Sequence, residues 1–230
     1  LHSDHVVGIP DLWLTGWIPT TFGRRNSPLN VYGPRGTKDM MDHLQKAFAW
    51  DIEIRRKEMN KADSGVMVNA KDIAEGYSWE KNGVKVTPFT VRHADHIDSA
   101  LGFRIDYAGR SVILSGDTRY SENLIKYAKG ADVVIHEVAF SNPTAEKSGL
   151  IKQILGYHTL PEEAGKVFTL VKPKLAVYSH IAIPLADPTL PPPGTEDLIQ
   201  RTRTTYTGPL VVGEDLLIIE IGDEVKTRKF

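Results

Sequence analysis

The sequence of 230 residues predicts a layered α/β protein. Short runs rich in β-branched residues alternate with segments of helical periodicity from one end of the chain to the other. Turn residues close several of the short runs, as at Gly33-Pro34 and Asn82-Gly83. Because no internal repeat or linker interrupts this alternation, we expect a single domain over residues 1–230.

The elements follow from these patterns in chain order. The expected strands, each a short apolar or β-branched run, are Leu29–Tyr32, Val84–Arg92, Leu101–Tyr107, Ser111–Leu114, Val133–His136, Leu175–Tyr178 and Leu216–Ile221. The expected helices are Gly36–Trp50, Ser121–Lys129, Glu146–Leu155, Pro161–Lys172 and Thr195–Thr205. Thr159 with Glu162 is typical of a capping box, and Pro161 fits the first turn of the helix that follows. The proline-rich segment Pro184–Gly194 predicts an extended rim loop.

Composition narrows the classes of function. Its 28 Lys and Arg residues against 29 Asp and Glu residues leave a formal net charge of −1, so bulk charge provides no drive toward nucleic acid. Because the chain has no cysteine, its strong zinc ligands must be histidine, aspartate and glutamate. No run approaches the roughly 18 apolar residues of a membrane span, so we expect a soluble protein without a membrane partner, cytoplasmic or periplasmic.

The chain opens on a cluster of metal-binding residue types. His2, Asp4 and His5 place two imidazoles and a carboxylate within four residues, directly before the apolar, glycine-containing run Val6–Ile9. Nitrogen and carboxylate oxygen donors on one short turn suit zinc.

Three more such residues stand at the ends of expected strands. They are His93, Asp117 in the sequence Ser-Gly-Asp-Thr, and His180 in Tyr-Ser-His. Side chains at strand ends meet at the edge of a sheet, although they lie far apart in sequence. We therefore expect these residues to converge on one cleft.

These motifs, in this order, resemble those of metallo-β-lactamase-fold hydrolases of the ribonuclease Z and arylsulfatase-like branch. The matching segments are residues 2–5, 102–105 (Gly-Phe-Arg-Ile), 115–118, 136–137 (His-Glu), 158–164 (His-Thr-Leu-Pro-Glu-Glu-Ala) and 178–180. The resemblance implies a four-layer αββα sandwich. It also implies that the first strands, and the first histidine of an HxHxDH motif, would precede Leu1.

The resemblance further implies a dinuclear zinc site. His2, His93 and Asp117 would hold one zinc with the upstream histidine, while Asp4, His5, Asp117 and His180 would hold the second. Two zinc ions roughly 3.5–4 Å apart can share a hydroxide nucleophile. Asp4 is also a catalytic candidate, and iron, manganese or cobalt are alternative metals. No nucleophile elbow or P-loop supports a different hydrolase.

The central ligand has two candidates, His93 and His96. The resemblance implies that members with small substrates place this ligand nine residues before the glycine of the Gly-Phe-Arg-Ile strand. In this sequence 102 − 93 = 9, which selects His93. Members that process tRNA use six, and 102 − 96 = 6 selects His96. We favour His93, which leaves His96 as a cleft-lining or solvated residue.

The resemblance also makes His158 a general acid that protonates the leaving oxygen, with Glu137 orienting its imidazole. The alternatives are a surface histidine before a helix and, for His136 with Glu137, a packed structural pair. Trp13 and Trp17 have the spacing of a cleft wall or, as we favour, of core packing.

Other segments are read as periphery. His43 is expected on a solvated helix face, and residues 51–77 as a lid over the cleft or a peripheral hairpin.

The expected activity is hydrolysis of a small phosphodiester, sulfate ester, lactone or other ester. Members that process tRNA carry a long arm between the central histidine and the bridging aspartate, but here only 117 − 93 = 24 residues separate them. A ribonuclease Z-type endonuclease that processes tRNA 3′ ends is the alternative, with nucleic acid the less favoured partner. A metal-binding module without catalysis is a third hypothesis. The resemblance alone suggests a homodimer.

Overall fold

The computed structural model describes residues 1–19, 23–59, 63–147, 149–185, 189 and 191–230. They form two compact units, residues 1–74 and residues 75–230, and each unit is described by itself. The single continuous domain stays a prediction. Within the described residues, no helix is both long enough and apolar enough to cross a membrane.

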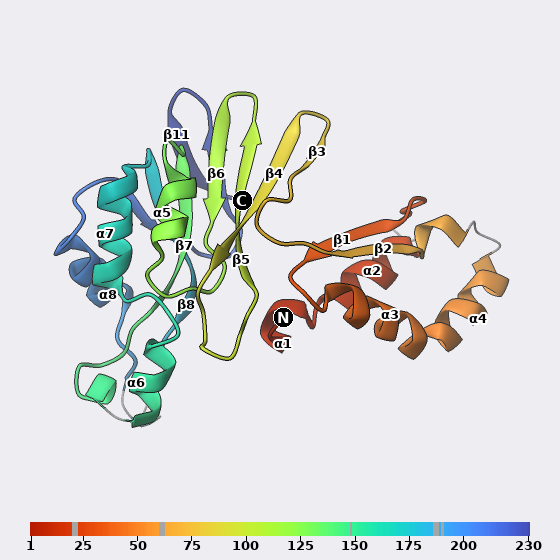
Figure 1. The fold of residues 1–230 in the computed structure, drawn as a ribbon, viewed down its shortest axis with the longest axis horizontal. Helices are drawn as coiled ribbons and strands as arrows, with labels where there is room; N and C mark the ends of the chain where they lie inside the picture. Colours follow the sequence, from red (N-terminus) through yellow and green to blue (C-terminus); the bar gives the residue numbers. More distant parts are fainter. Residues whose placement is uncertain (20–22, 60–62, 148, 186–188, 190) are drawn as a thin grey trace. The chain divides into compact units, whose positions relative to one another are not determined.

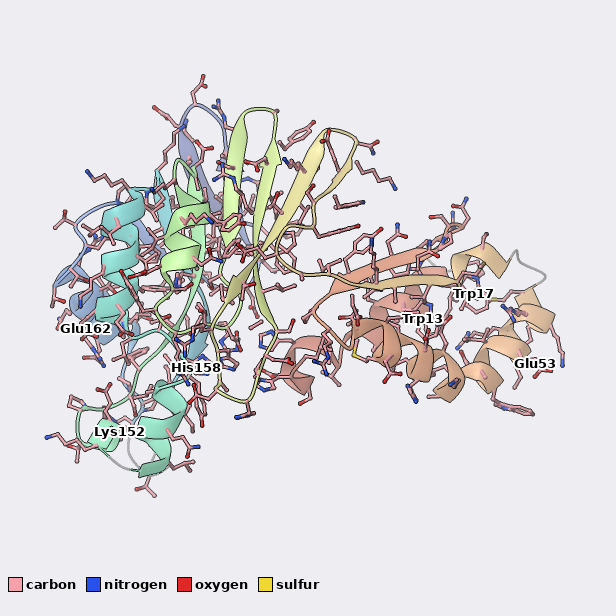
Figure 2. All side chains as sticks on the ribbon, viewed as in Figure 1. Trp13, Trp17, Glu53, Lys152, His158 and Glu162 are labelled. Carbon is pink, nitrogen blue, oxygen red and sulfur yellow. The ribbon has the colours of Figure 1, made fainter. Side chains whose placement is uncertain are left out.

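The first unit combines helices with a two-stranded parallel sheet (Figure 1). Its elements are α1 (Ser3–Val6), α2 (Ile9–Trp17), β1 (Leu29–Gly33), α3 (Thr37–Ala47), α4 (Ala49–Met59), a 3-10 turn (Asp63–Gly65) and β2 (Val68–Asp72). Trp13 and Trp17 on α2 are completely buried among apolar side chains such as Met41 (Figure 2). The two indoles are therefore core residues of this unit, in keeping with the large apolar area that tryptophan buries.

Two expectations for this unit need correction. The helix expected over residues 36–50 is divided, since α3 ends at Ala47 and α4 begins at Ala49. Within residues 51–77, the expected hairpin is instead the rest of α4, a 3-10 turn and strand β2, which pairs in parallel with β1. The alternative of a lid stays a prediction, and residues 60–62 lie outside the described residues. His43 lies on the exposed face of α3 as expected, with its Nδ1 2.9 Å from the carbonyl of Asp39.

The second unit is built on a seven-stranded mixed sheet. Its strands, in spatial order, are β3 (Trp79–Lys81), β4 (Val84–Val91), β5 (Ala100–Tyr107), β6 (Arg110–Leu114), β7 (Val133–Ala139), β8 (Leu175–Ala182) and β9 (Leu210–Val212). A separate antiparallel hairpin consists of β10 (Leu217–Ile221) and β11 (Val225–Lys229). The helices are α5 (Glu122–Ala128), α6 (Gly149–Leu155), α7 (Pro161–Val171) and α8 (Thr195–Arg203), with a 3-10 turn at Ala145–Lys147.

The two faces of this sheet are covered differently (Figure 1). Side chains of α5, α7 and α8 pack on one face against residues such as Val134 and Val138, while the β10–β11 hairpin packs on the other against Val133 and Leu175. Successive side chains of β7 point to opposite faces of the sheet, and both faces are covered. The apolar run of β7 is therefore nearly continuous. This unit therefore has three layers, helix, sheet and sheet, in agreement with the predicted α/β class.

Strand direction brings the carboxyl ends of several strands to one edge of the sheet. β4 and β6 both run antiparallel to β5, so they point the same way, and β6, β7 and β8 are mutually parallel. The carboxyl ends of β4, β6, β7 and β8 consequently share one edge. Ligands and active sites occupy this edge in open α/β sheets.

The start of α7 differs from the expected capping box. Leu160 is the N-cap, and the backbone N–H of Leu160 donates a hydrogen bond to the Glu163 carboxylate at 3.1 Å. Thr159 does not cap the helix, because its hydroxyl donates to the Thr118 carbonyl at 2.6 Å. Part of the predicted rim loop, residues 186–188 and 190, lies outside the described residues.

Candidate active site

His93 follows the end of β4 and is held by the main chain. Its ring is buried, and Nδ1 lies 2.7 Å from the Tyr157 carbonyl oxygen. A carbonyl only accepts, so Nδ1 carries the proton and the lone pair of Nε2 remains for another partner. Nε2 lies 3.9 Å from Oδ2 of Asp117. The competing residue His96 is exposed, with its ring edge-on to Tyr157.

Asp117 is placed by a tight turn after β6. Gly116 has a φ of 59°, and a Cβ there would lie 2.5 Å from the Leu101 carbonyl oxygen. The turn therefore requires glycine. It aims the largely buried Asp117 carboxylate at two histidines, with Oδ2 toward His93 and Oδ1 3.6 Å from Nδ1 of His180.

His180 occupies an irregular position near the end of β8. Its φ is 46°, in the left-handed region that few residues other than glycine adopt. The register between β7 and β8 shifts in this region, between His136 and Val138. Positive φ at a non-glycine residue costs backbone energy and tends to occur at functional sites. Here it accompanies an imidazole directed at Asp117.

These three side chains fit a metal centre. The Asp117 oxygens lie 3.9 Å from Nε2 of His93 and 3.6 Å from Nδ1 of His180, which is longer than a hydrogen bond. The three side chains therefore converge without direct hydrogen bonds at these positions. Each oxygen of Asp117 faces a different imidazole, as expected of a carboxylate shared by two ions. Imidazole nitrogen and carboxylate oxygen are suitable ligands for zinc.

Glu137 lies beside this cluster at a β-bulge. The register shift between β7 and β8 spans its position, and bulges of this kind redirect side chains next to active sites. The carboxylate is almost fully buried and accepts hydrogen bonds from the backbone N–H groups of Thr118 and Thr159, at 3.0 and 3.1 Å. Burial raises the pKa of Glu137, while its hydrogen bond with His158 opposes that rise.

His158 is oriented by this carboxylate. Its Nδ1 lies 3.2 Å from Oε2 of Glu137, and its ring lies next to two expected ligands. The ring centroids are 4.9 Å from that of His93 and 5.8 Å from that of His180. The role of His158 as a general acid stays a prediction.

The opening motif belongs to the first unit. His2 is the N-cap of α1, and Asp4 and His5 lie on that helix, with 3.3 Å between Oδ2 of Asp4 and Nε2 of His5. All three residues are exposed. Their participation in one metal centre with His93, Asp117 and His180 stays a prediction.

The groups that hold the imidazoles were missed in the sequence. Tyr157 acts through its backbone carbonyl and Thr118 and Thr159 through their N–H groups, which carry no side-chain signature. Arg119 was also missed, although it follows Asp117-Thr118 directly. It forms an ion pair with Asp95 at 2.9 Å, and its guanidinium lies over the Tyr157 ring.

Comparison with known proteins agrees with this architecture. Residues 1–181 match the family described as the Beta-lactamase superfamily domain. A protein named putative ribonuclease Z from Mycobacterium tuberculosis is 29% identical over 224 residues, covering 96% of each chain. The ribonuclease Z of Mycobacterium sp. (strain KMS) is 30% identical over 226 residues, covering 96% of this chain and 75% of the relative.

Solved structures share the fold at low identity. The metallo-beta-lactamase fold protein YhfI from Bacillus subtilis gives a TM-score of 0.61 with 14% identity, over 93% of this chain and 72% of that one. The short form of human tRNase Z gives 0.53 with 19% identity, over 83% of this chain and 74% of that one. The chain thus belongs to the beta-lactamase superfamily, and it is a metal-dependent hydrolase that acts on ester bonds.

Proposed function

We propose that this hydrolase cleaves phosphodiester bonds in RNA, as an endonuclease of the ribonuclease Z type acting at tRNA 3′ ends. The relatives named ribonuclease Z align over 96% of the chain. Two features favour a small ester instead, namely the net charge of −1 and the short stretch between His93 and Asp117. The alignment outweighs the net charge, because a local contact surface does not depend on the charge of the whole chain.

The metal ligands in this proposal are His2, Asp4 and His5 of the opening motif together with His93, Asp117 and His180, and the metals are two zinc ions. The donor chemistry of the six residues and the convergence of the last three support the assignment. When bound, such ions polarise a phosphoryl oxygen and make water nucleophilic near neutral pH. Asp4 is proposed as a ligand and as a catalytic carboxylate.

His158 is proposed as the proton donor, and the contact of its Nδ1 with Oε2 of Glu137 at 3.2 Å supports this role. Hydrolysis adds the oxygen of water to phosphorus and breaks the bond from phosphorus to the leaving oxygen, which needs a proton. Glu137 at Nδ1 stabilises the imidazolium form of His158, whose Nε2 then donates that proton. The proton lost by water restores the imidazolium.

One observation favours a second candidate, a small phosphodiester or other ester. Between His93 and Asp117 the chain forms a short loop and the compact β5–β6 hairpin, with two residues between the strands. An arm that grips tRNA is therefore absent from this stretch, all of which is described.

The two candidates are separated by a substrate panel. Protein purified without chelator is assayed for metal content by mass spectrometry, and for turnover of precursor tRNA, bis(p-nitrophenyl) phosphate, p-nitrophenyl sulfate and a lactone. Cleavage at the 3′ end of precursor tRNA, with about two zinc ions per chain, supports the proposal. Turnover of small esters alone supports the second candidate, and a metal-loaded protein inert toward every substrate contradicts both.

A further inference from the structure

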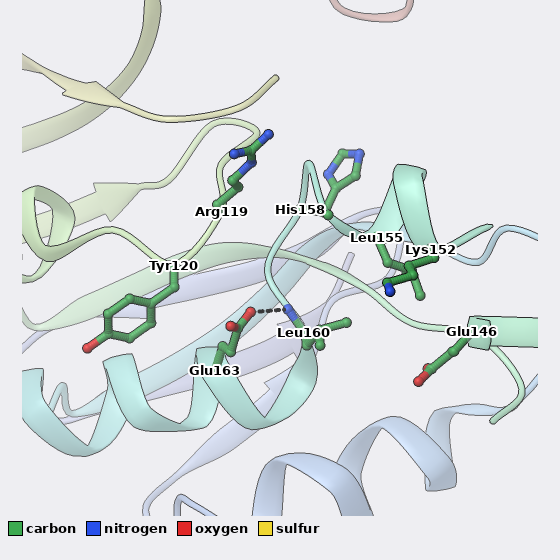
Figure 3. A pocket seen from close by; sticks show the side chains of 9 residues that line it. Arg119, Tyr120, Glu146, Lys152, Leu155, His158, Leu160 and Glu163 are labelled. Carbon is green, nitrogen blue, oxygen red and sulfur yellow. Dashed lines mark hydrogen bonds between the residues drawn. The ribbon is translucent and has the colours of Figure 1, made fainter. Parts of the chain in front are cut away.

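A cavity of about 360 Å³ lies beside His158 within the second unit (Figure 3). Tyr120, Leu155 and Leu160 contribute apolar surface to it, while Arg119 and Lys152 contribute cationic groups. Its size falls within the range of small-molecule binding pockets. The mechanism described above assigns no role to these residues apart from His158.

The two acidic residues of the lining are already engaged. Glu146 pairs with the guanidinium of Arg201 at 2.6 Å and accepts a hydrogen bond from the Ser141 N–H. Glu163 accepts from the Leu160 N–H in the first turn of α7, where the helix dipole favours a carboxylate. The charge of Glu146 is therefore balanced by Arg201, and the Glu163 carboxylate is held at the start of α7.

The two cationic groups differ in their own partners. Lys152 extends from α6, and no ion pair of its ammonium is found among the described residues (Figures 2 and 3). Arg119 is fixed by Asp95 and by the Tyr157 ring, so its guanidinium charge is held in place beside the cavity, and within the described part of the chain its Nε is buried without a hydrogen-bond partner. Buried donors in native proteins are usually paired, so an unpaired one needs an explanation.

We infer that this cavity is a subsite for the leaving fragment of the substrate, and that Lys152 and Arg119 bind a further phosphate on that fragment. The inference rests on the proposed function, since His158 lines the cavity and protonates the oxygen of the leaving fragment. The fragment must then lie on the cavity side of the scissile bond. The apolar wall accepts a sugar or base, and the cations select a phosphate.

Three dinucleotides test this subsite. They are uridylyl-uridine, the same dimer with an added 5′-phosphate, and the same dimer with an added 3′-phosphate. One added phosphate lies on the fragment released with a free hydroxyl, and the other lies on the fragment that keeps the scissile phosphorus. Product analysis identifies which is which.

We expect the phosphate on the released fragment to raise kcat/KM about tenfold, the effect of one good charge-assisted contact. Lys152→Met should remove this gain and Lys152→Arg should keep most of it. Lys129→Met is the matched control, because Lys129 is an exposed lysine after α5 that does not line the cavity. In Lys129→Met, the ratio of kcat/KM with and without the phosphate on the released fragment should equal that of the unaltered protein.

Equal gains from both phosphates, or a gain that survives in Lys152→Met, would overturn the subsite. Hydrolysis of bis(p-nitrophenyl) phosphate with no turnover of any dinucleotide would also overturn it, while phosphodiester hydrolysis itself would stand. Failure to hydrolyse every phosphodiester would instead refute the proposed function on which the subsite depends.

Discussion

The strand-end cluster and the opening motif use the same residue types in opposite settings. His93 is buried, with one nitrogen fixed by a carbonyl and the other facing Asp117. His5 is exposed on a helix of four residues that contains no buried side chain. The comparison shows that the sheet edge orients its donors within the second unit itself. The residues of the opening motif instead lie on an exposed helix of a single turn.

The largest expected effect comes from removing the carboxylate that faces both histidines. Asp117→Ala should abolish metal loading and turnover together, because it removes the carboxylate whose two oxygens face His93 and His180. Metal content by mass spectrometry and initial rates on bis(p-nitrophenyl) phosphate measure both losses. Asp215→Ala, which alters an exposed acid near β10, is the control. An active, metal-replete Asp117→Ala variant would refute the role of Asp117.

Removing the proton donor should reduce the rate and leave the metals bound. His158→Asn is expected to lower kcat by about 10²–10⁴-fold on an alkyl phosphodiester, the usual contribution of general acid catalysis. The loss should be much smaller with a p-nitrophenyl ester, since p-nitrophenolate leaves without a proton. His43→Asn, on the exposed face of α3, is the control. Equal losses on the two substrates would argue against proton donation by His158.

Acid should weaken the second unit through His136. Its ring is completely buried against Phe168, and burial lowers its pKa from 6.5 to about 4. Between those two values the unfolded chain takes up a proton that the folded chain refuses, so the free energy of unfolding falls as pH falls. The loss is fully developed below pH 4, and 6.5 − 4 = 2.5 pK units correspond to about 3 kcal/mol.

Urea unfolding at several pH values measures this loss. In His136→Phe the fall between pH 6.5 and pH 4 should be smaller by that amount, whereas in His43→Asn it should match the unaltered protein. An unchanged pH dependence in His136→Phe would show that other groups dominate acid unfolding.

The smallest expected effect compares the two regions directly, in metal-free protein. His93→Ala should cost about 1–3 kcal/mol, because it leaves the Tyr157 carbonyl without its donor in a buried place. His5→Ala removes an exposed ring, so we expect a change within about 0.5 kcal/mol. Thermal unfolding after treatment with chelator measures both. Equal losses would mean that the opening motif is as firmly built as the strand ends.

Sequence patterns anticipated the parts of the fold that bury apolar runs. The strands at Val84–Arg92 and Val133–His136 and the helix at Pro161–Lys172 agree closely with β4, β7 and α7. Strand β11 escaped prediction because Val225–Lys229 is mostly polar and exposed. Helix α2 also escaped prediction, because it has only nine residues and contains Pro10 and Gly16, which are poor helix formers.

The site was predictable to the extent that it consists of side chains at strand ends. His93, Asp117 and His180 converge because strand direction brings their positions to one edge. The hydrogen-bond donors and acceptors around them were not predictable, since Tyr157 and Thr118 act through backbone atoms that every residue has. The left-handed conformation of His180 likewise has no signature in residue type.

The chain between Glu137 and His158 leaves the sheet edge, forms the 3-10 turn and α6, and returns to the same edge. Both of its ends are fixed by the buried hydrogen bonds of Glu137 with His158 and Thr159. The excursion between those ends carries Lys152 and Leu155, while His93, Asp117 and His180 lie elsewhere in the sequence. Its length and composition can therefore change over evolution and retune which substrates are accepted, while the chemistry at the sheet edge is inherited unaltered.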